Sequence, residues 1–290
     1  MKNYSLLKNN SNHFINALAA LVFFLLSIVA EAKAQSYSLR SNTDKPFSLR
    51  LHTGAQGQGA LVQYTGQKEI IPLRLKSLKN NVVKKIASTT FIWEEIYRGK
   101  VTGSYGLTKT ADQISNIWYQ RNKDGKRFVL SPVVKPEGSQ EDDKVLLHNV
   151  LFTFNSSVDD NLTIKYPNGK QTIQELHGFD NPNASRNCLI NDYNFDGYQD
   201  LAFSIPDAGM GVYRIFSIWL YNPETKRFEA LKEPDYSKSK CSELCDVTID
   251  PKKKLLYSAC RGGARWWQDV YKFDKNKKMI WVKSAELTNP

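Results

Sequence analysis

Residues 114–130 have the sequence ISNIWYQRNKDGKRFVL, and this stretch decides the fold class. β-Branched and aromatic residues dominate its first half, and a second short run of strand-forming residues, 127–130, closes it. Between the two runs stands Asp124-Gly125, a dipeptide that favours the left-handed backbone of a tight hairpin turn. The stretch therefore predicts two antiparallel strands joined by a turn.

The same pattern recurs along the chain. Asn168-Gly169 separates the runs 162–166 and 171–173, and Asn222-Pro223-Glu224 stands before Phe228. Other alternating or β-rich runs cover residues 47–51, 71–75, 90–97, 145–154, 212–221 and 279–282. We predict a mainly β protein with an antiparallel strand-turn-strand architecture and few short helices.

One short helix is possible in residues 75–86. Leu75, Leu78, Val82 and Ile86 follow one another at steps of three and four, although Asn80-Asn81 weakens the pattern. Residues 131–144 (SPVVKPEGSQEDDK) hold two prolines, a glycine and an acidic run, which is typical of a linker or a long surface loop. This segment either divides an N-terminal β region, 35–135, from a C-terminal one, 136–290, or forms a loop within one sheet system. No internal repeat is strong enough to predict a propeller.

The N-terminus has the features of an export signal. Lys2 and Lys8 precede the apolar run 17–30 (ALAALVFFLLSIVA), and Ala32-Lys33-Ala34 matches a signal peptidase site. We predict a signal peptide over residues 1–34 and a mature protein in the periplasm or secreted from the cell. An uncleaved anchor over 14–30 is the alternative, since 17 residues are near the short limit for a membrane span. No later segment is apolar enough to span a membrane.

The chain is basic, with a formal net charge of +11. Residues 1–34 carry three lysines and one glutamate, so the mature protein keeps a net charge of about +9. Outside the cytoplasm such a surface favours acidic polymers, membrane surfaces or acidic proteins and makes nucleic acid an unexpected partner. The alternative is that lysines such as 252–254 and 275–278 are merely solvated turn residues.

Four cysteines lie in the mature chain, and an even number in an oxidising compartment predicts two disulfides. Three pairings are possible. We favour Cys241 with Cys245, which a tight turn can join, and Cys188 with Cys260. Zinc binding is the weaker interpretation, because no second cysteine or histidine pair has zinc-ligand spacing.

Residues 192–200 (DYNFDGYQD) have the spacing of a calcium loop, with oxygen-bearing groups at positions 1, 3, 5, 7 and 9 and a glycine, Gly197, at position 6. The predicted ligands are Asp192, Asn194, Asp196, the backbone carbonyl of Tyr198, and Asp200. Position 12 is Phe203 instead of a bidentate glutamate, and 201–205 is strand-like, so the loop differs from a regulatory EF-hand. We expect a structural Ca²⁺ with a dissociation constant on the order of 10⁻⁴ to 10⁻³ M. The alternative is a turn rich in Asp and Asn that holds no metal.

Residues 261–267 (RGGARWW) form the candidate partner-binding loop, because arginine and tryptophan are enriched in interface hot spots. The predicted contact residues are Arg261, Gly262, Gly263, Arg265, Trp266 and Trp267. The alternative places one tryptophan in the core and the other at the start of a strand. A second glycine-rich loop, 206–211, could lie beside the calcium loop. No catalytic motif is recognisable, so we expect a binding protein, with a cell-wall hydrolase as the enzymatic alternative.

The segments CLINDYNFDGYQDL (188–201), IWLYNPETKRF (218–228) and SACRGGA (258–264) resemble a bacterial family of exported proteins. That family is related to periplasmic lysozyme inhibitors, and members act as immunity proteins against peptidoglycan-hydrolysing toxins of type IV secretion systems. The resemblance covers about residues 147–282. It implies an antiparallel β fold with a calcium loop of this kind, with the ligands given above.

Lysozyme inhibitors of this kind often present a Ser-Gly-x-x-Tyr loop, and residues 262–266 are its nearest counterpart here, with Gly262 in place of serine and Trp266 in place of tyrosine. The predicted function is binding of a cell-wall-degrading enzyme, with inhibition as the role that the resemblance implies. The alternative is a calcium-stabilised module that binds envelope peptidoglycan directly through Trp266 and Trp267.

Overall fold

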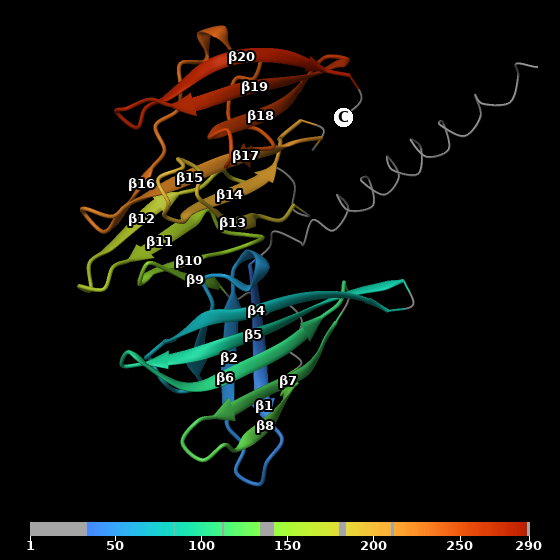
Figure 1. Ribbon diagram of the computed structural model, residues 1–290, viewed down its shortest axis with the longest axis vertical. Helices are drawn as coiled ribbons and strands as arrows, with labels where there is room; N and C mark the ends of the chain where they lie inside the picture. The colour runs from blue at the N-terminus through green and yellow to red at the C-terminus, as the bar shows by residue number, and fades with distance from the viewer. Residues whose placement is uncertain are drawn as a thin grey trace, which may run out of the picture.

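A computed structural model describes residues 34–83, 85–111, 113–133, 142–179, 184–209 and 212–288. Within these ranges every regular element is a β-strand except two short 3-10 turns, η1 (Ala55–Gly57) and η2 (Tyr236–Lys238) (Figure 1). The prediction of a mainly β, antiparallel protein is therefore confirmed. Residues 1–33, which carry the predicted export signal, and 134–141, which contain the predicted region boundary, lie outside the described residues.

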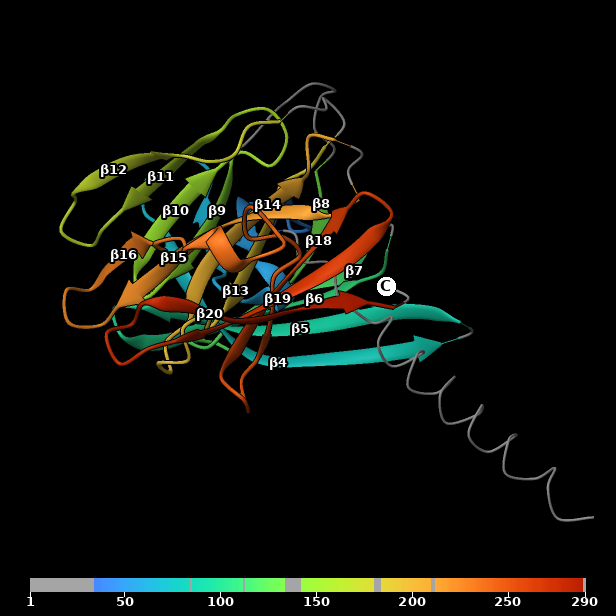
Figure 2. The same cartoon turned by 90° about the horizontal axis from the view of Figure 1, so that it is seen from above.

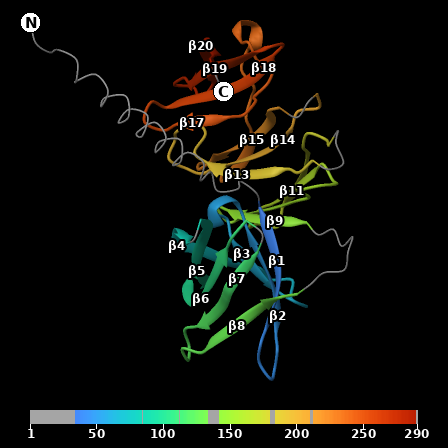
Figure 3. The same ribbon diagram turned by 90° about the vertical axis from the view of Figure 1, so that its right-hand side faces the viewer.

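The first eight strands form a closed antiparallel barrel, because β1 pairs with β2 along one edge and with β8 along the other (Figure 3). Each strand otherwise pairs with its neighbour in the sequence, as short turns favour. The strands are β1 (Gln35–Ser41), β2 (Ser48–Thr53), β3 (Leu61–Tyr64), β4 (Ile71–Val83), β5 (Ile86–Tyr97), β6 (Lys100–Lys109), β7 (Ile114–Arg121) and β8 (Arg127–Pro132).

Side chains fill the interior of the barrel, as expected for eight strands. Alternate residues on its strands contribute the buried apolar core, which includes Leu39, Leu51, Trp93 and Leu107. The indole nitrogen of Trp93 donates a 2.7 Å hydrogen bond to the carbonyl of Gly57 in η1. Gly57 has φ +73°, and a Cβ atom there would lie 2.6 Å from the ring of Phe91, so only glycine fits this turn.

The predicted helix over 75–86 is wrong, because this segment forms the distal part of the β4–β5 hairpin. Val83 pairs with Ile86 across the turn, and the ladder continues back to Leu73 and Glu95. The apolar residues at helical spacing do not share a buried face, since Val82 and Ile86 are 61% and 62% exposed. β-Branched residues also favour an extended backbone, which overrode the weak helical spacing.

Twelve further strands form three four-stranded antiparallel sheets, each with its strands in chain order. The sheets lie one above another beyond one end of the barrel (Figures 1 and 3). The first contains β9 (Asp143–Leu147), β10 (Val150–Phe154), β11 (Asn161–Lys165) and β12 (Gln171–Glu175). The second contains β13 (Asn187–Asn191), β14 (Asp200–Pro206), β15 (Arg214–Asn222) and β16 (Arg227–Ala230). The third contains β17 (Thr248–Asp250), β18 (Leu255–Gly262), β19 (Arg265–Phe273) and β20 (Met279–Leu287).

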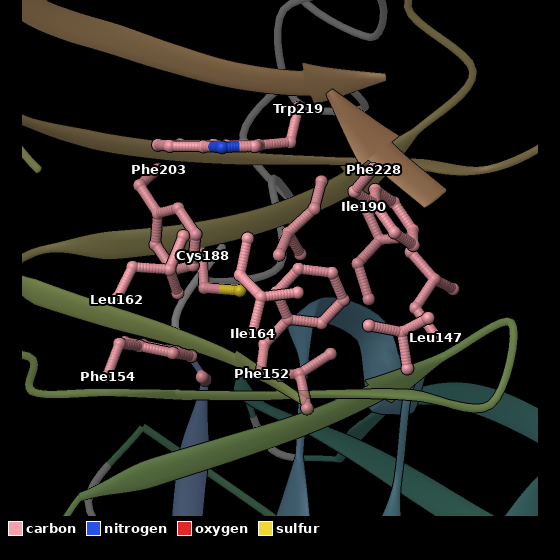
Figure 4. Close-up of a cluster of buried hydrophobic side chains, with 14 of the residues drawn as sticks. Leu147, Phe152, Phe154, Leu162, Ile164, Cys188, Ile190, Phe203, Trp219 and Phe228 are labelled. Atoms are coloured by element: carbon pink, nitrogen blue, oxygen red, sulfur yellow. The ribbon is translucent and has the colours of Figure 1, made fainter. Parts of the chain in front are cut away.

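The second sheet is covered on both faces. One apolar core, which includes Phe152, Phe154, Phe203 and Trp219, lies between it and the first sheet (Figure 4). Another, which includes Ile218 and Tyr271, lies between it and the third sheet. Its strand β14 is consequently buried at six consecutive positions, 200–205. The run of buried residues is what a strand with two covered faces requires.

The predicted disulfide pairing is wrong, since the structure joins Cys241 to Cys260 and leaves Cys188 and Cys245 as buried thiols. Cys188 lies on β13 and points into the core between the first two sheets (Figure 4). Cys260 belongs to the third sheet, so the second sheet separates the two sulfur atoms. Cys245 packs beside the disulfide, where burial raises the pKa of its thiol to about 12. Spacing along the chain cannot reveal these positions in three dimensions.

The barrel and the stacked sheets meet at η1 and β9. The amide of Leu146 donates to the carbonyl of Gly59, at 2.9 Å, and the hydroxyl of Ser36 donates to Asp143, at 2.8 Å. A Cβ atom at Gly59 would lie 2.5 Å from the side chain of Val145, so β9 packs directly on this turn. Backbone and side-chain contacts therefore join the two parts of the chain.

Candidate functional site

The predicted calcium loop connects β13 to β14 in the second sheet. Asn191 and Asp200 pair across its base, so the loop is closed by the antiparallel ladder. Two residues in it have left-handed backbone, Phe195 with φ +62° and Gly197 with φ +91°. Gly197 tolerates this conformation without strain, which explains the glycine at position 6.

Side-chain oxygens of the loop accept hydrogen bonds from the loop's own amides. Asp192 accepts from the amides of Asp196, at 3.0 Å, and Gly197, at 2.9 Å. Asn194 accepts from the Asp196 amide, at 3.1 Å, and Asp196 accepts from the Tyr198 amide, at 3.0 Å. These contacts turn the three side chains towards the concave side of the loop, as in linked Asx turns.

Asp200, at position 9, is fully buried. Its two carboxylate oxygens accept from the amides of Tyr193, at 2.9 Å, and Tyr221, at 2.8 Å. The pKa of Asp200 is raised to about 7, mainly by burial and to a smaller degree by the charges of Asp196 and Asp192, although the two amide hydrogen bonds lower it. The loop therefore brings negative charge close to a buried carboxyl group.

The donor set suits a hard cation, because each of the five predicted ligands has a carboxylate, amide or backbone carbonyl oxygen, although the Asn194 amide nitrogen donates to Asp196 Oδ2, at 3.1 Å, in this structure. The exposed Lys277 reaches this set, with its Nζ 3.8 Å from Asp196 Oδ2. The side chains are nevertheless not drawn round one point. Across the described ranges, no three His, Cys, Asp or Glu side chains are grouped closely enough to hold a metal ion. The oxygen donors and the glycine turn suit calcium, although the three carboxylates are not grouped closely around one point in this structure.

The loop lies against the barrel. Gln199 donates from its side chain to Gln58, next to η1, at 2.6 Å, and its carbonyl is 2.8 Å from Nε2 of His148. The His148 ring stacks on Tyr221, with ring centroids 3.9 Å apart. The loop is therefore connected by hydrogen bonds to the junction between the barrel and the sheets.

A pocket of about 690 Å³ lies beside the loop, between the β15–β16 hairpin and the β19–β20 turn. Its lining has mixed charge, with Glu229, Glu233, Lys232, Lys277 and Lys278 round an apolar floor that includes Leu220 and Met279. Sequence reasoning missed this pocket, because its walls come from segments distant in the chain.

The predicted partner-binding loop is the tip of the β18–β19 hairpin. Gly262 pairs with Arg265 and Arg261 with Trp266, so the turn itself is Gly263-Ala264, with φ +62° at Gly263. Arg261 and Arg265 are exposed, Trp266 is half-buried, and Arg265 Nη1 lies 3.6 Å from Glu286. Arg261 and the half-buried Trp266 are paired and therefore share one face of the hairpin, whereas Arg265 lies on the opposite face, on the side of Trp267.

Trp267 has a different role. It packs against the cluster of Cys241, Cys245 and Cys260, and the Lys240 ammonium lies 5.0 Å from its ring centroid. Trp267 therefore packs the base of the hairpin against the disulfide.

The two predicted sites lie far apart. β19 begins at the hairpin tip and ends next to the calcium loop, where the Phe273 and Phe195 rings are 6.4 Å apart. Nine extended residues separate the sites by about 27 Å. The glycine-rich segment after Pro206 follows the far end of β14, so the expectation that it lies beside the calcium loop is wrong; its residues 210 and 211 are outside the described ranges.

No helix within the described ranges has the length and apolar character needed to span a bilayer. In comparisons with known proteins, no family model and no curated protein matches the chain.

Proposed function

We propose that the chain is an exported binding protein whose β18–β19 hairpin recognises a cell-wall-degrading enzyme. The observation that carries the proposal is the disulfide at the base of the hairpin tip. Cys260, one residue before Arg261, is tied by the disulfide to Cys241, and Trp267 packs on that bond. A binding loop held in one conformation loses little entropy on association, which favours affinity.

The chemistry of the tip suits a protein or a glycan carrying carboxylates. Arg261 and Arg265 offer planar guanidinium groups that bind carboxylates in two-point contacts. Trp266 offers apolar area with a polar N–H, which is typical of interface hot spots. The resemblance to lysozyme inhibitors favours a hydrolase as the partner, and the stacking ability of Trp266 supports direct binding of peptidoglycan as the alternative.

Calcium has a structural role in this proposal. Asp192, Asn194, Asp196, Asp200 and the carbonyl of Tyr198 would hold the ion. Bound there, Ca²⁺ supplies positive charge to a loop with three carboxylates. An ordered loop would also hold the junction with the barrel in place, because Gln199 contacts both Gln58 and His148 there.

The test is capture by immobilised mature protein, residues 35–290, from a mixture of purified muramidases and, separately, on peptidoglycan sacculi. We expect stoichiometric capture and inhibition of one hydrolase. Trp266→Ala, and Arg261→Ala with Arg265→Ala, should each weaken binding about thirtyfold or more, as loss of hot-spot residues does. Lys272→Ala, exposed on the same strand beyond the tip, is the matched control.

Retention on sacculi without any protein partner would support the glycan alternative, provided that Trp266→Ala abolishes it. Capture of a hydrolase that survives all the tip substitutions would contradict the proposed surface.

A further inference from the structure

The β4–β5 hairpin extends beyond the barrel (Figure 2). Its strands have 13 and 12 residues, whereas β3 has four and β8 six. The ladder from β5 to β6 ends at Thr89, so in the described part beyond that residue the two strands pair only with each other. All described residues from Lys79 to Ala87 are exposed. The end of the hairpin is a free two-stranded ribbon.

Large aliphatic side chains gather at the end of this ribbon. Val82, Val83 and Ile86 are 61%, 65% and 62% exposed. Val83 is opposite Ile86, and Val82 is opposite Ala87, so both faces of the ribbon carry apolar groups. Solvent-exposed aliphatic side chains grouped in this way mark an interaction site.

The sequence at the end of the hairpin carries charge of one sign. Residues 77–93 contain three lysines, at positions 79, 84 and 85, and no aspartate or glutamate. The nearest acidic side chain in sequence, Glu94, already pairs with Arg74, at 2.6 Å, and Lys76, at 3.2 Å. The tip therefore complements a negatively charged surface.

We propose that the β4–β5 tip inserts into the surface of a membrane rich in anionic phospholipids. Aliphatic groups on both faces suit immersion between acyl chains, whereas a protein groove would leave one face of the ribbon in water. The tip has no tryptophan, tyrosine or arginine, the residues that dominate protein interfaces, and valine is under-represented in such hot spots. Lysines that flank an apolar tip bind anionic headgroups, and this binding weakens when salt is added. Membrane binding by the β4–β5 tip does not depend on whether the β18–β19 hairpin binds a partner.

The test is co-sedimentation of the mature protein with vesicles of phosphatidylcholine alone or mixed equally with phosphatidylglycerol. The tip variant is Val82→Ser, Val83→Ser, Ile86→Ser. The matched control is Val129→Ser, Val158→Ser, Ile173→Ser, whose wild-type side chains are 58%, 52% and 62% exposed elsewhere. We expect binding to the anionic vesicles only, a loss of about tenfold or more in the tip variant, and wild-type binding in the control. Lys79→Glu with Lys85→Glu should also weaken binding.

Equal binding by wild type and tip variant, or no binding to anionic vesicles, would overturn the proposal. Self-association of the wild type that sedimentation velocity shows to depend on the same three side chains would also overturn it, by making a second copy the occupant.

Discussion

Replacing Arg186 with methionine should lower the free energy of unfolding by about 3–5 kcal/mol, because it leaves buried acceptors without a donor. The Arg186 side chain is 1% exposed. Its Nη1 donates to the carbonyls of Asn155, at 2.7 Å, and Asp159, at 2.8 Å. Its Nη2 donates to the carbonyl of His177, at 2.7 Å, and to Asp160 Oδ1, at 2.9 Å. One guanidinium group therefore holds two chain segments, the 155–160 loop and the chain at His177, beside the first sheet.

Urea unfolding followed by tryptophan fluorescence measures this change. Arg227→Met is the control, since Arg227 is exposed at the start of β16 and its replacement should alter stability by less than about 0.5 kcal/mol. Arg186→Lys should recover part of the loss, because an ammonium group keeps the charge but not the planar fork. If the urea concentrations at half-unfolding were equal for Arg186→Met and Arg227→Met, the buried Arg186 guanidinium would not stabilise the fold as proposed.

Phe152→Ala should lower the free energy of unfolding by about 3–5 kcal/mol, the range for removing a large aromatic side chain from a packed core. Phe152 is fully buried on β10 and meets Phe228 of β16 edge to face, with ring centroids 4.8 Å apart. The substitution therefore opens a cavity between the first and second sheets (Figure 4).

Ile173→Ala is the matched control for this cavity. Ile173 lies in the same sheet, on β12, but is 62% exposed, so its truncation should cost less than about 1 kcal/mol. Urea unfolding compares the two variants directly. Equal effects would mean that the first sheet does not pack on the second through Phe152.

Local sequence was sufficient to predict much of the strand structure. The turns at Asp124-Gly125 and Asn168-Gly169 lie where expected, with φ +67° and +83° at the glycines. Turn chemistry of this kind acts over two to four residues, so it is visible without tertiary contacts. The closed barrel and the stacked sheets were not predicted, because they depend on pairing between distant strands, such as β1 with β8.

The errors have the same physical origin. Of the apolar residues at helical spacing, Leu75 packs against the barrel core, but Val82 and Ile86 are exposed, and the hairpin ladder prevailed. The disulfide pairing depended on which faces of the sheets Cys188 and Cys260 occupy, which chain spacing does not encode. The candidate calcium loop, in contrast, is one continuous segment, so its residues could be proposed from sequence alone, and that proposal remains a prediction. The roles of Arg186 and His148, and the pocket beside the loop, arise only where separate segments meet.

Residues 192–200 are proposed to bind a structural calcium ion that orders the loop next to the barrel. Calorimetric titration of Ca²⁺ into the metal-free mature protein tests it most directly, beside the Asp192→Ala, Asp196→Ala variant. Thermal melting in chelator must first show that the variant is folded. We expect saturable binding to the wild type, with a dissociation constant on the order of 10⁻⁴ to 10⁻³ M, and none to the variant. Absence of binding at millimolar calcium, or equal binding by the folded variant, would contradict it.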